Sequence, residues 1–136
     1  MDRAEITRRL HRARSATLGT VDHHGRPHLV PIVFAYEHGR LYTAVDLKPK
    51  STLRLKRLAN IEANPQVSVL VDHYDDDWSK LWWVRLDGTA QVVRSGPSLR
   101  KGLALLTSKY DVYTTQPPPG PVIDVTVETV RAWSAT

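Results

Sequence analysis

Residues 15–46, SATLGTVDHHGRPHLVPIVFAYEHGRLYTAVD, decide the fold that we expect for this chain. Three apolar runs are separated by the turns HHGR (23–26) and EHGR (37–40). Glycine in the third place of each turn allows the positive φ that tight hairpins need. We therefore predict a meander of three antiparallel strands, over 15–22, 27–36 and 41–46.

The middle run, 27–36, is apolar at nearly every position. Such a pattern is typical of a strand that is buried on both faces, which we predict here. Pro31 has no N–H to donate, so we expect it to mark a bulge or a missing ladder bond.

Outward from this meander, apolar residues alternate between helical and strand spacing. Asp2 and Glu5 resemble a capping box, Asn64-Pro65 ends a helical pattern, and Gly88 is a candidate bulge or bend in a long strand. We predict helices over 2–14, 51–64 and 98–110, further strands over 66–74, 81–94 and 121–136, and a stiff loop with three prolines over 111–121. The fold class is mostly β with flanking helices, a closed barrel of six antiparallel strands in one domain, 1–136.

Composition excludes several classes of protein. The chain of 136 residues has no cysteine, which excludes disulfides and thiolate metal sites. It has no apolar run of the ~20 residues that span a bilayer and no signal-peptide pattern at its start, so we predict a cytoplasmic protein with no membrane partner. The net charge of +5 is concentrated in 1–14 and 46–58. A basic patch could attract nucleic acid, a membrane surface or an anionic small molecule, and the alternative for 1–14 is a solvated helix face.

The turn KPKST, 48–52, is the strongest local signal of a site. Lys48 and Lys50 flank a proline, and two hydroxyls follow where a helix begins. Backbone N–H groups at a helix N-terminus favour an anion, and ammonium groups add charge-assisted hydrogen bonds. The pattern therefore predicts a phosphate site, with a lysine-rich surface turn as the alternative.

The tryptophans suggest a second wall. Trp82 and Trp83 are adjacent in a strand and must point to opposite faces, so one can be core while the other packs on a cofactor ring or a dimer partner. The alternative is that both are core or interface residues. The acidic run at 72–77 and the histidines at 23–28 lack the ligand spacing of a metal site, and no nucleophile has an identifiable base.

Two longer segments resemble a known family. SATLGTVDHHGRPHLVPIVFAY, 15–36, is similar to the strand pair of the pyridoxamine 5'-phosphate oxidase-like superfamily. Residues 41–88, especially KPK and NIEANPQVSVLVDHYDDDWSKLWWVR, resemble its actinobacterial branch that uses the deazaflavin coenzyme F420, and 120–136 fits the same branch. The paired arginines of the vitamin B6 oxidases are absent at the C-terminus, which argues against oxidation of pyridoxine phosphate.

The resemblance implies a split β-barrel homodimer with two cofactor sites at its interface. It also implies the residues that contact the cofactor. In the second strand these are Val30, Pro31 and Ile32; in the third strand Thr43, Ala44 and Val45; in the phosphate turn Lys48, Lys50, Ser51 and Thr52; and, in a wall beside the ring, Trp78 and Trp83.

We therefore expect an F420-dependent oxidoreductase that transfers a hydride between the cofactor and a small organic acceptor. FMN in the same site is one alternative, and a non-catalytic flavin- or deazaflavin-binding protein is another. Nucleic-acid binding by the arginine-rich first helix is a third, but aromatic residues are not interleaved with the basic ones there, so we expect no nucleic-acid partner.

Overall fold

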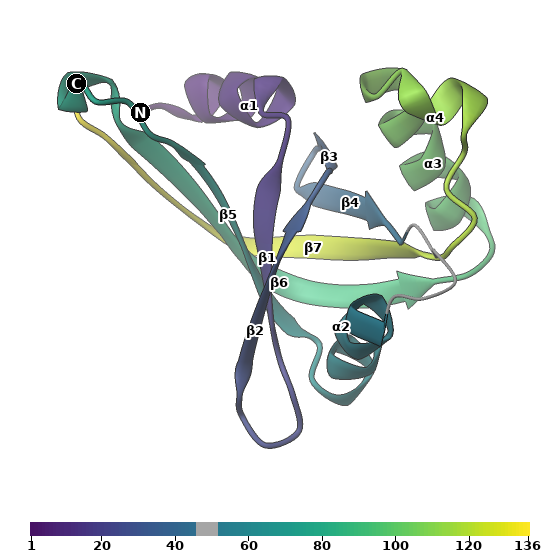
Figure 1. Cartoon of the computed structure of the whole chain (residues 1–136). Helices are drawn as coiled ribbons and strands as arrows, with labels where there is room; N and C mark the ends of the chain where they lie inside the picture. Colours follow the sequence, from purple (N-terminus) through teal and green to yellow (C-terminus); the bar gives the residue numbers. More distant parts are fainter. Residues whose placement is uncertain (46–51) are drawn as a thin grey trace.

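The computed structural model describes residues 1–45 and 52–136. Its described strands form one antiparallel sheet of seven, in the order β2-β1-β5-β6-β7-β4-β3 (Figure 1). In chain order the elements are α1 (Arg3–Arg12), β1 (Ala16–Val21), β2 (Pro27–Ile32), β3 (Ala35–Glu37), β4 (Arg40–Ala44), α2 (Thr52–Ala63), β5 (Gln66–His73), the 3-10 turn η1 (Trp78–Lys80), β6 (Trp82–Val93), α3 (Pro97–Lys109), α4 (Val112–Thr115) and β7 (Val122–Ser134).

The prediction of six strands is wrong, because the middle strand of the meander divides in two. Within the described residues, β2 ends at Ile32, and β3 begins at Ala35. β2 pairs with β1, whereas β3 pairs with β4. These two strands stand at opposite ends of the sheet order, so among the described strands no ladder closes the barrel. The sheet instead curls into a half-barrel, and the short link of Val33 and Phe34 joins its two edges.

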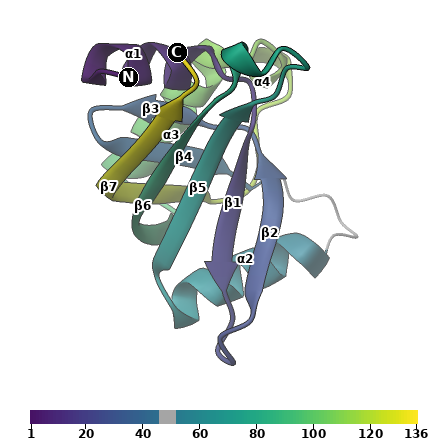
Figure 2. The same ribbon diagram turned by 90° about the vertical axis from the view of Figure 1, so that its left-hand side faces the viewer.

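The burial of β2 also differs from the prediction. Leu29 is 70% exposed, and burial alternates along β2, so this strand is not buried on both faces. Pro31 pairs in regular register with Thr17 and marks no bulge. β2 is an edge strand with a partner on one side only, which is where a residue without an N–H is tolerated. Figure 2 shows this outer face, with β7, β6, β5, β1 and β2 side by side.

A bulge in the long hairpin of β6 and β7 bends the sheet. The register shifts between Asp87 and Gly88, which confirms the predicted bulge. β6 pairs with β5 from Trp82 to Thr89, just past the shift, and β7 pairs with β4 only beyond it, over 122–126. The bulge therefore lies where the two halves of the curled sheet meet.

Helices cover the openings of the curl and one of its faces. Leu10 of α1 and Leu58 and Ile61 of α2 join the core inside the sheet, with α1 and α2 at opposite ends of it (Figure 1). A smaller core lies between α3 and the β3–β4 end of the sheet. A Cβ on Gly102 of α3 would lie 2.9 Å from the ring of Tyr42, so glycine permits this close packing.

The observed helix ends agree with the predicted ones where the sequence carries a local capping signal. Asp2 caps α1, its side chain accepting a hydrogen bond from the backbone N–H of Glu5 at 2.8 Å. The region 111–121 differs, because a one-turn helix, α4, precedes the prolines that we expected to keep it in a loop. No helix in the described part of the chain is long and apolar enough to cross a membrane.

Candidate functional site

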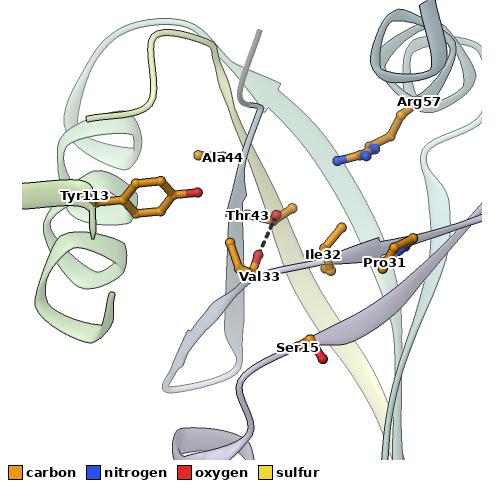
Figure 3. A pocket seen from close by; sticks show the side chains of 8 residues that line it. All are labelled: Ser15, Pro31, Ile32, Val33, Thr43, Ala44, Arg57 and Tyr113. Carbon is orange, nitrogen blue, oxygen red and sulfur yellow. Dashed lines mark hydrogen bonds between the residues drawn. The ribbon is translucent and has the colours of Figure 1, made fainter. Parts of the chain in front are cut away.

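A cavity of about 330 Å³ opens where the divided strand leaves the sheet. Its floor comes from the end of β2, the link that follows it and the end of β4, while α2 and α4 form opposite walls (Figure 3). The lining residues are Ser15, Pro31, Ile32, Val33, Thr43, Ala44, Arg57 and Tyr113.

Side chains, rather than a neighbouring strand, form hydrogen bonds to the backbone of the link between β2 and β3. The hydroxyl of Thr43 donates to the carbonyl of Val33 at 2.7 Å, as drawn in Figure 3. The hydroxyl oxygen of Tyr110 accepts from the backbone N–H of Phe34 at 3.1 Å. The carbonyl oxygens of Phe34 and Arg14 lie at 3.1 and 3.0 Å from the same hydroxyl. Buried backbone groups need such partners, so these contacts fix the shape of the floor.

The buried surroundings of this link change the pKa of a neighbouring lysine, Lys109. The ammonium of Lys109 lies 4.0 Å from the centre of the Phe34 ring and donates to the carbonyl of Leu10 at 3.3 Å. Burial, with a smaller effect of the nearby Arg14, lowers the pKa of Lys109 to about 8. The link is thus part of a well-packed interior and is a firm support for the cavity.

Arg57 brings a positive charge to the cavity wall. Arg57 is 7% exposed, and it is the one charged residue in the described lining. It lies on the inward face of α2, four residues before the buried Ile61 and three before the buried Asn60, which donates to Thr20 at 3.1 Å. A guanidinium at the wall of an apolar cavity is suited to an anionic group of a ligand, because the low dielectric strengthens the attraction.

Tyr113 faces Arg57 from the other wall. In Figure 3 its ring reaches from α4 into the cavity towards Thr43 and Ala44. The ring of Tyr113 packs edge-on against Tyr110, with 6.1 Å between centroids. The cavity therefore combines an apolar floor with a cation on one side and a phenol on the other.

The structure brings together part of the site predicted from the sequence. Pro31, Ile32, Thr43 and Ala44 all line the cavity. The other two strand residues do not. Val45 is fully buried, and half-buried Val30 packs on the inner core.

The predicted phosphate turn is the part of the site that the structure does not describe. Lys48, Lys50 and Ser51 lie outside the described residues. Thr52 is the first residue of α2, but its side chain is outside the description as well. Ser15, Arg57 and Tyr113 are the lining residues with polar side chains that sequence reasoning missed. Arg57 had a detectable signal, since its spacing from Ile61 places it on the same helix face.

The tryptophans lie away from this cavity. Trp82 packs against the inner core, whereas Trp83 faces outwards and pairs with Trp133 of β7, as the opposite-face argument requires. Trp83 lines a second cavity, of about 460 Å³, on the outer face of the sheet. Trp78 is 69% exposed on η1 and lines neither cavity.

Side chains of the arginine-rich first helix and of the acidic run at 72–77 have interaction partners within the molecule. In α1, Arg9 pairs with Glu5 at 2.7 Å and lies over the Trp82 ring at 4.9 Å. The acidic run ends in a capped turn, where Asp77 accepts hydrogen bonds from the side chain and the backbone of Ser79. These hydrogen bonds, the side-chain one most, lower the pKa of Asp77. Among the described residues no cluster of three or more histidine, aspartate or glutamate side chains could hold a metal ion.

Comparison with known families assigns the chain to one of them. The model of the pyridoxamine 5'-phosphate oxidase family matches residues 3–134. The chain belongs to the pyridoxamine 5'-phosphate oxidase family. Members of this family share a flavin-binding fold, which accords with the cavity at the strand ends. No curated protein matches the chain.

Solved structures share the fold at low sequence identity. A conserved hypothetical protein from Mycobacterium tuberculosis is 24% identical, with a TM-score of 0.81, over 99% of this chain and 86% of that one. A FAD-binding protein from Mesorhizobium loti is 22% identical, with a TM-score of 0.73, over 97% and 94%. The heme storage protein HutZ from Vibrio cholerae is 17% identical, with a TM-score of 0.73, over 97% and 93%. At these identities the likeness establishes the fold alone.

Proposed function

We propose that this protein is an F420-dependent oxidoreductase that passes a hydride between the deazaflavin and a small organic acceptor. The observation that carries the proposal is the cavity at the ends of β2 and β4, with its apolar floor and its buried Arg57. The cofactor supplies the hydride chemistry, and the protein supplies binding, orientation and electrostatics.

The residues present fit such a group. Pro31, Ile32 and Ala44 offer apolar surface for a planar ring. Arg57 is a donor for an anionic group, which the predicted lysines of the 48–52 turn would also contact. Since α2 follows that turn directly, the phosphate would be held near the start of this helix, with the ring over the strand ends.

Other cofactors suit the same chemistry. FMN has a phosphate and a planar ring of similar size, and one protein of similar fold is FAD-binding. The acidic tail of F420 favours it over FMN on a chain with a net charge of +5. A non-catalytic carrier is the second candidate function, and the heme storage protein of similar fold favours it. A cytoplasmic location stays a prediction.

Replacing Lys50 tests the phosphate turn. Lys50→Ala should weaken cofactor binding by about tenfold or more, because a charge-assisted hydrogen bond contributes ~1.5–3 kcal/mol. Titration of both proteins with F420 and with FMN, followed by fluorescence, measures the dissociation constants. Lys80→Ala, at an exposed lysine of η1, is the matched control. Equal affinities of Lys50→Ala and the control would reject the assignment of the turn.

Turnover separates an enzyme from a carrier. The protein is mixed with reduced F420 and a panel of activated alkenes and quinones. Oxidation of the cofactor is followed by the absorbance of oxidised F420, at about 420 nm. Oxidation that depends on the acceptor and scales with protein concentration supports the oxidoreductase. Tight cofactor binding with no turnover across the panel would favour the carrier.

The outer face supports a homodimer. Leu29 and Leu70 are exposed there, around the cavity that Trp83 lines. Charges of both signs surround this apolar centre, with Arg85 bound to Asp87 at 3.1 Å. A face that carries both signs can complement a second copy of itself across a twofold axis. The proposed occupant is therefore a second copy of this chain.

A charge at the centre of this face should prevent association. Leu70→Lys is expected to convert dimer to monomer at micromolar concentration, because a buried ammonium without a partner is costly. Sedimentation equilibrium measures the mass, and Tyr74→Lys, at an exposed residue beyond the end of β5, is the control. A Leu70→Lys protein that sediments like the unaltered chain would place the interface elsewhere.

A further inference from the structure

The second half of β7 is a sheet edge with no neighbouring strand among the described residues. β7 pairs with β4 only over 122–126, and just beyond this the backbone N–H of Val127 donates to the carbonyl of Gly39 at 2.9 Å. From Thr129 to Ser134 β7 pairs with β6 on one side, and no described strand follows on the other. Such an edge presents a row of unpaired backbone donors and acceptors, which are able to bind another strand.

The register shows which backbone groups face this free edge. The N–H of Ala135 donates to the carbonyl of Leu81, which lies opposite it, at 3.0 Å. Hydrogen-bonded and non-hydrogen-bonded pairs alternate along an antiparallel ladder, so 129, 131, 133 and 135 bond towards β6. The N–H and C=O groups of Val130, Ala132 and Ser134 therefore point to the free edge.

A cavity of about 580 Å³ lies along this edge, between β7, α1 and the hairpin of β3 and β4. The start of α1 and the end of β7 lie close together in Figures 1 and 2. Val130 is 41% exposed, whereas Ile6, Tyr36 and Val127 pack against the inner core from the same side. An aliphatic side chain from an added strand would thus find apolar surface beside Val130. The lining residues are Arg3, Ile6, Thr7, Tyr36, His38, Gly39, Val127, Glu128 and Val130.

A second copy of β7 does not suit this edge. The symmetric antiparallel pairing that uses all the outward groups sets Val130 opposite Ala132 of the copy, and it centres on Arg131. Arg131 would then lie directly opposite Arg131 of the copy, and like charges in that position are destabilising. In addition, α1 and the β3–β4 hairpin wall the cavity, while β7 of a folded copy is backed by its own β6. A single extended segment is the better occupant.

Arg3 gives this occupant a charge preference. It is exposed on the α1 side of the cavity, and it has no ion pair among the described residues. Glu128, on the β7 side, instead accepts a hydrogen bond from the hydroxyl of Thr89 at 2.9 Å. A carboxylate on the added segment would form a charge-assisted contact with the free guanidinium.

We propose that the free edge of β7 binds an extended segment of a partner protein as an added antiparallel strand, with an aliphatic side chain beside Val130 and an acidic residue at Arg3. In this mode of recognition backbone hydrogen bonds supply affinity, and contacts of alternate side chains supply specificity. The site is separate from the cavity at the ends of β2 and β4, and its occupation does not depend on a cofactor.

Two N-methylated isomers of one peptide test strand addition on the unaltered protein. The probe is the fluorescein-labelled peptide amide Asp-Thr-Val-Thr-Val-Thr, and fluorescence anisotropy follows its titration with protein. Directly opposite residues share a face of a sheet, so the valines beside Val130 and Ala132 turn their N–H groups towards β7. Methylation of both valine nitrogens should weaken binding by about tenfold or more, because two hydrogen bonds are lost. Methylation of the two preceding threonine nitrogens, which face solvent, should change affinity by less than about threefold.

A proline on the edge tests the same hydrogen bonds from the protein side. Ala132→Pro removes an N–H that faces the groove, and proline is tolerated where a strand donates nothing to its ladder. It should weaken binding of the unmethylated peptide by about fivefold or more, since one hydrogen bond is lost and the ring crowds the edge. Ala132→Ser keeps the N–H at this exposed position and is the matched control.

Exchange of charge tests the contact at Arg3. Arg3→Glu should weaken binding of the aspartate peptide by about threefold to tenfold, and a peptide with lysine in place of aspartate should recover the loss. Arg8→Glu, at an exposed residue of α1 outside the cavity lining, is the control for the change in net charge.

The outcomes decide the proposal without any variant that must fold. No binding of the unmethylated peptide at about 1 mM by the unaltered protein overturns it, since that affinity is the least that recognition requires. Equal affinities of the two methylated isomers overturn strand addition as well. If Ala132→Pro instead lowers the mass of the protein in sedimentation equilibrium, a second copy occupies the edge and the proposed partner is wrong.

Discussion

Gly88→Ala is expected to lower the free energy of unfolding by about 3 kcal/mol or more, as overpacking against immovable atoms does. A Cβ at Gly88 would lie 2.1 Å from the carbonyl oxygen of Thr126 and 3.1 Å from the Cα of Val127. Both atoms belong to the backbone of β7, so no side-chain rotation relieves the overlap. Relief would require β6 and β7 to separate where the register shifts, which is the bend that joins the two halves of the sheet.

Gly19→Ala is the matched control, because it also adds one methyl group in a strand. There the nearest atom is the end of the Leu29 side chain, at 3.2 Å, and that side chain is largely exposed and can move. Its cost should stay below about 1 kcal/mol. Equilibrium unfolding in guanidinium chloride, at one protein concentration, compares the variants. If the two glycines prove equally tolerant, the bend does not depend on the close approach at Gly88.

Gly88 also illustrates what a sequence reveals. The bulge, the Asp2 cap and the two His-Gly-Arg turns were all predicted correctly, because each depends on neighbours within a few residues. In the second turn, His38 and Gly39 both have positive φ, which a two-residue hairpin requires. Apart from α4 and the divided strand over 27–36, the strand and helix positions followed from the same local patterns, as did the opposite orientations of Trp82 and Trp83.

The division of β2 from β3 could not be predicted in this way. Residues 27–36 form one continuous apolar run, and the side chain that holds the backbone of Phe34 is Tyr110, 76 positions further along the chain. Tyr113 and Arg57 were missed as site residues for the same reason, since both depend on long-range contacts. Tyr113 of α4 lines the cavity beside Thr43 and Ala44 of β4, which lie far earlier in the chain, and Arg57 needs the curl of the sheet to meet that space.

Removing one hydroxyl should show how much depends on that long-range contact. Tyr110→Phe is expected to cost about 3 kcal/mol of unfolding free energy, since a buried group left without its hydrogen bond costs ~1–3 kcal/mol and more than one group is affected. The N–H of Phe34 loses its acceptor, and the carbonyls of Phe34 and Arg14 lose their shared donor. The ring itself remains, so apolar packing against α3 and α4 is retained.

The same variant connects stability with the site. Tyr110 supports both the link that forms the cavity floor and the ring of Tyr113 in its wall. Loosening the link should therefore weaken binding of F420 even at temperatures where the variant remains folded. Thermal unfolding and F420 titration of Tyr110→Phe, beside Tyr74→Phe as an exposed control, measure both effects. Loss of stability with unchanged cofactor affinity would show that the floor keeps its shape without this anchor, and that the ends of β2 and β4 alone set the geometry of the cavity.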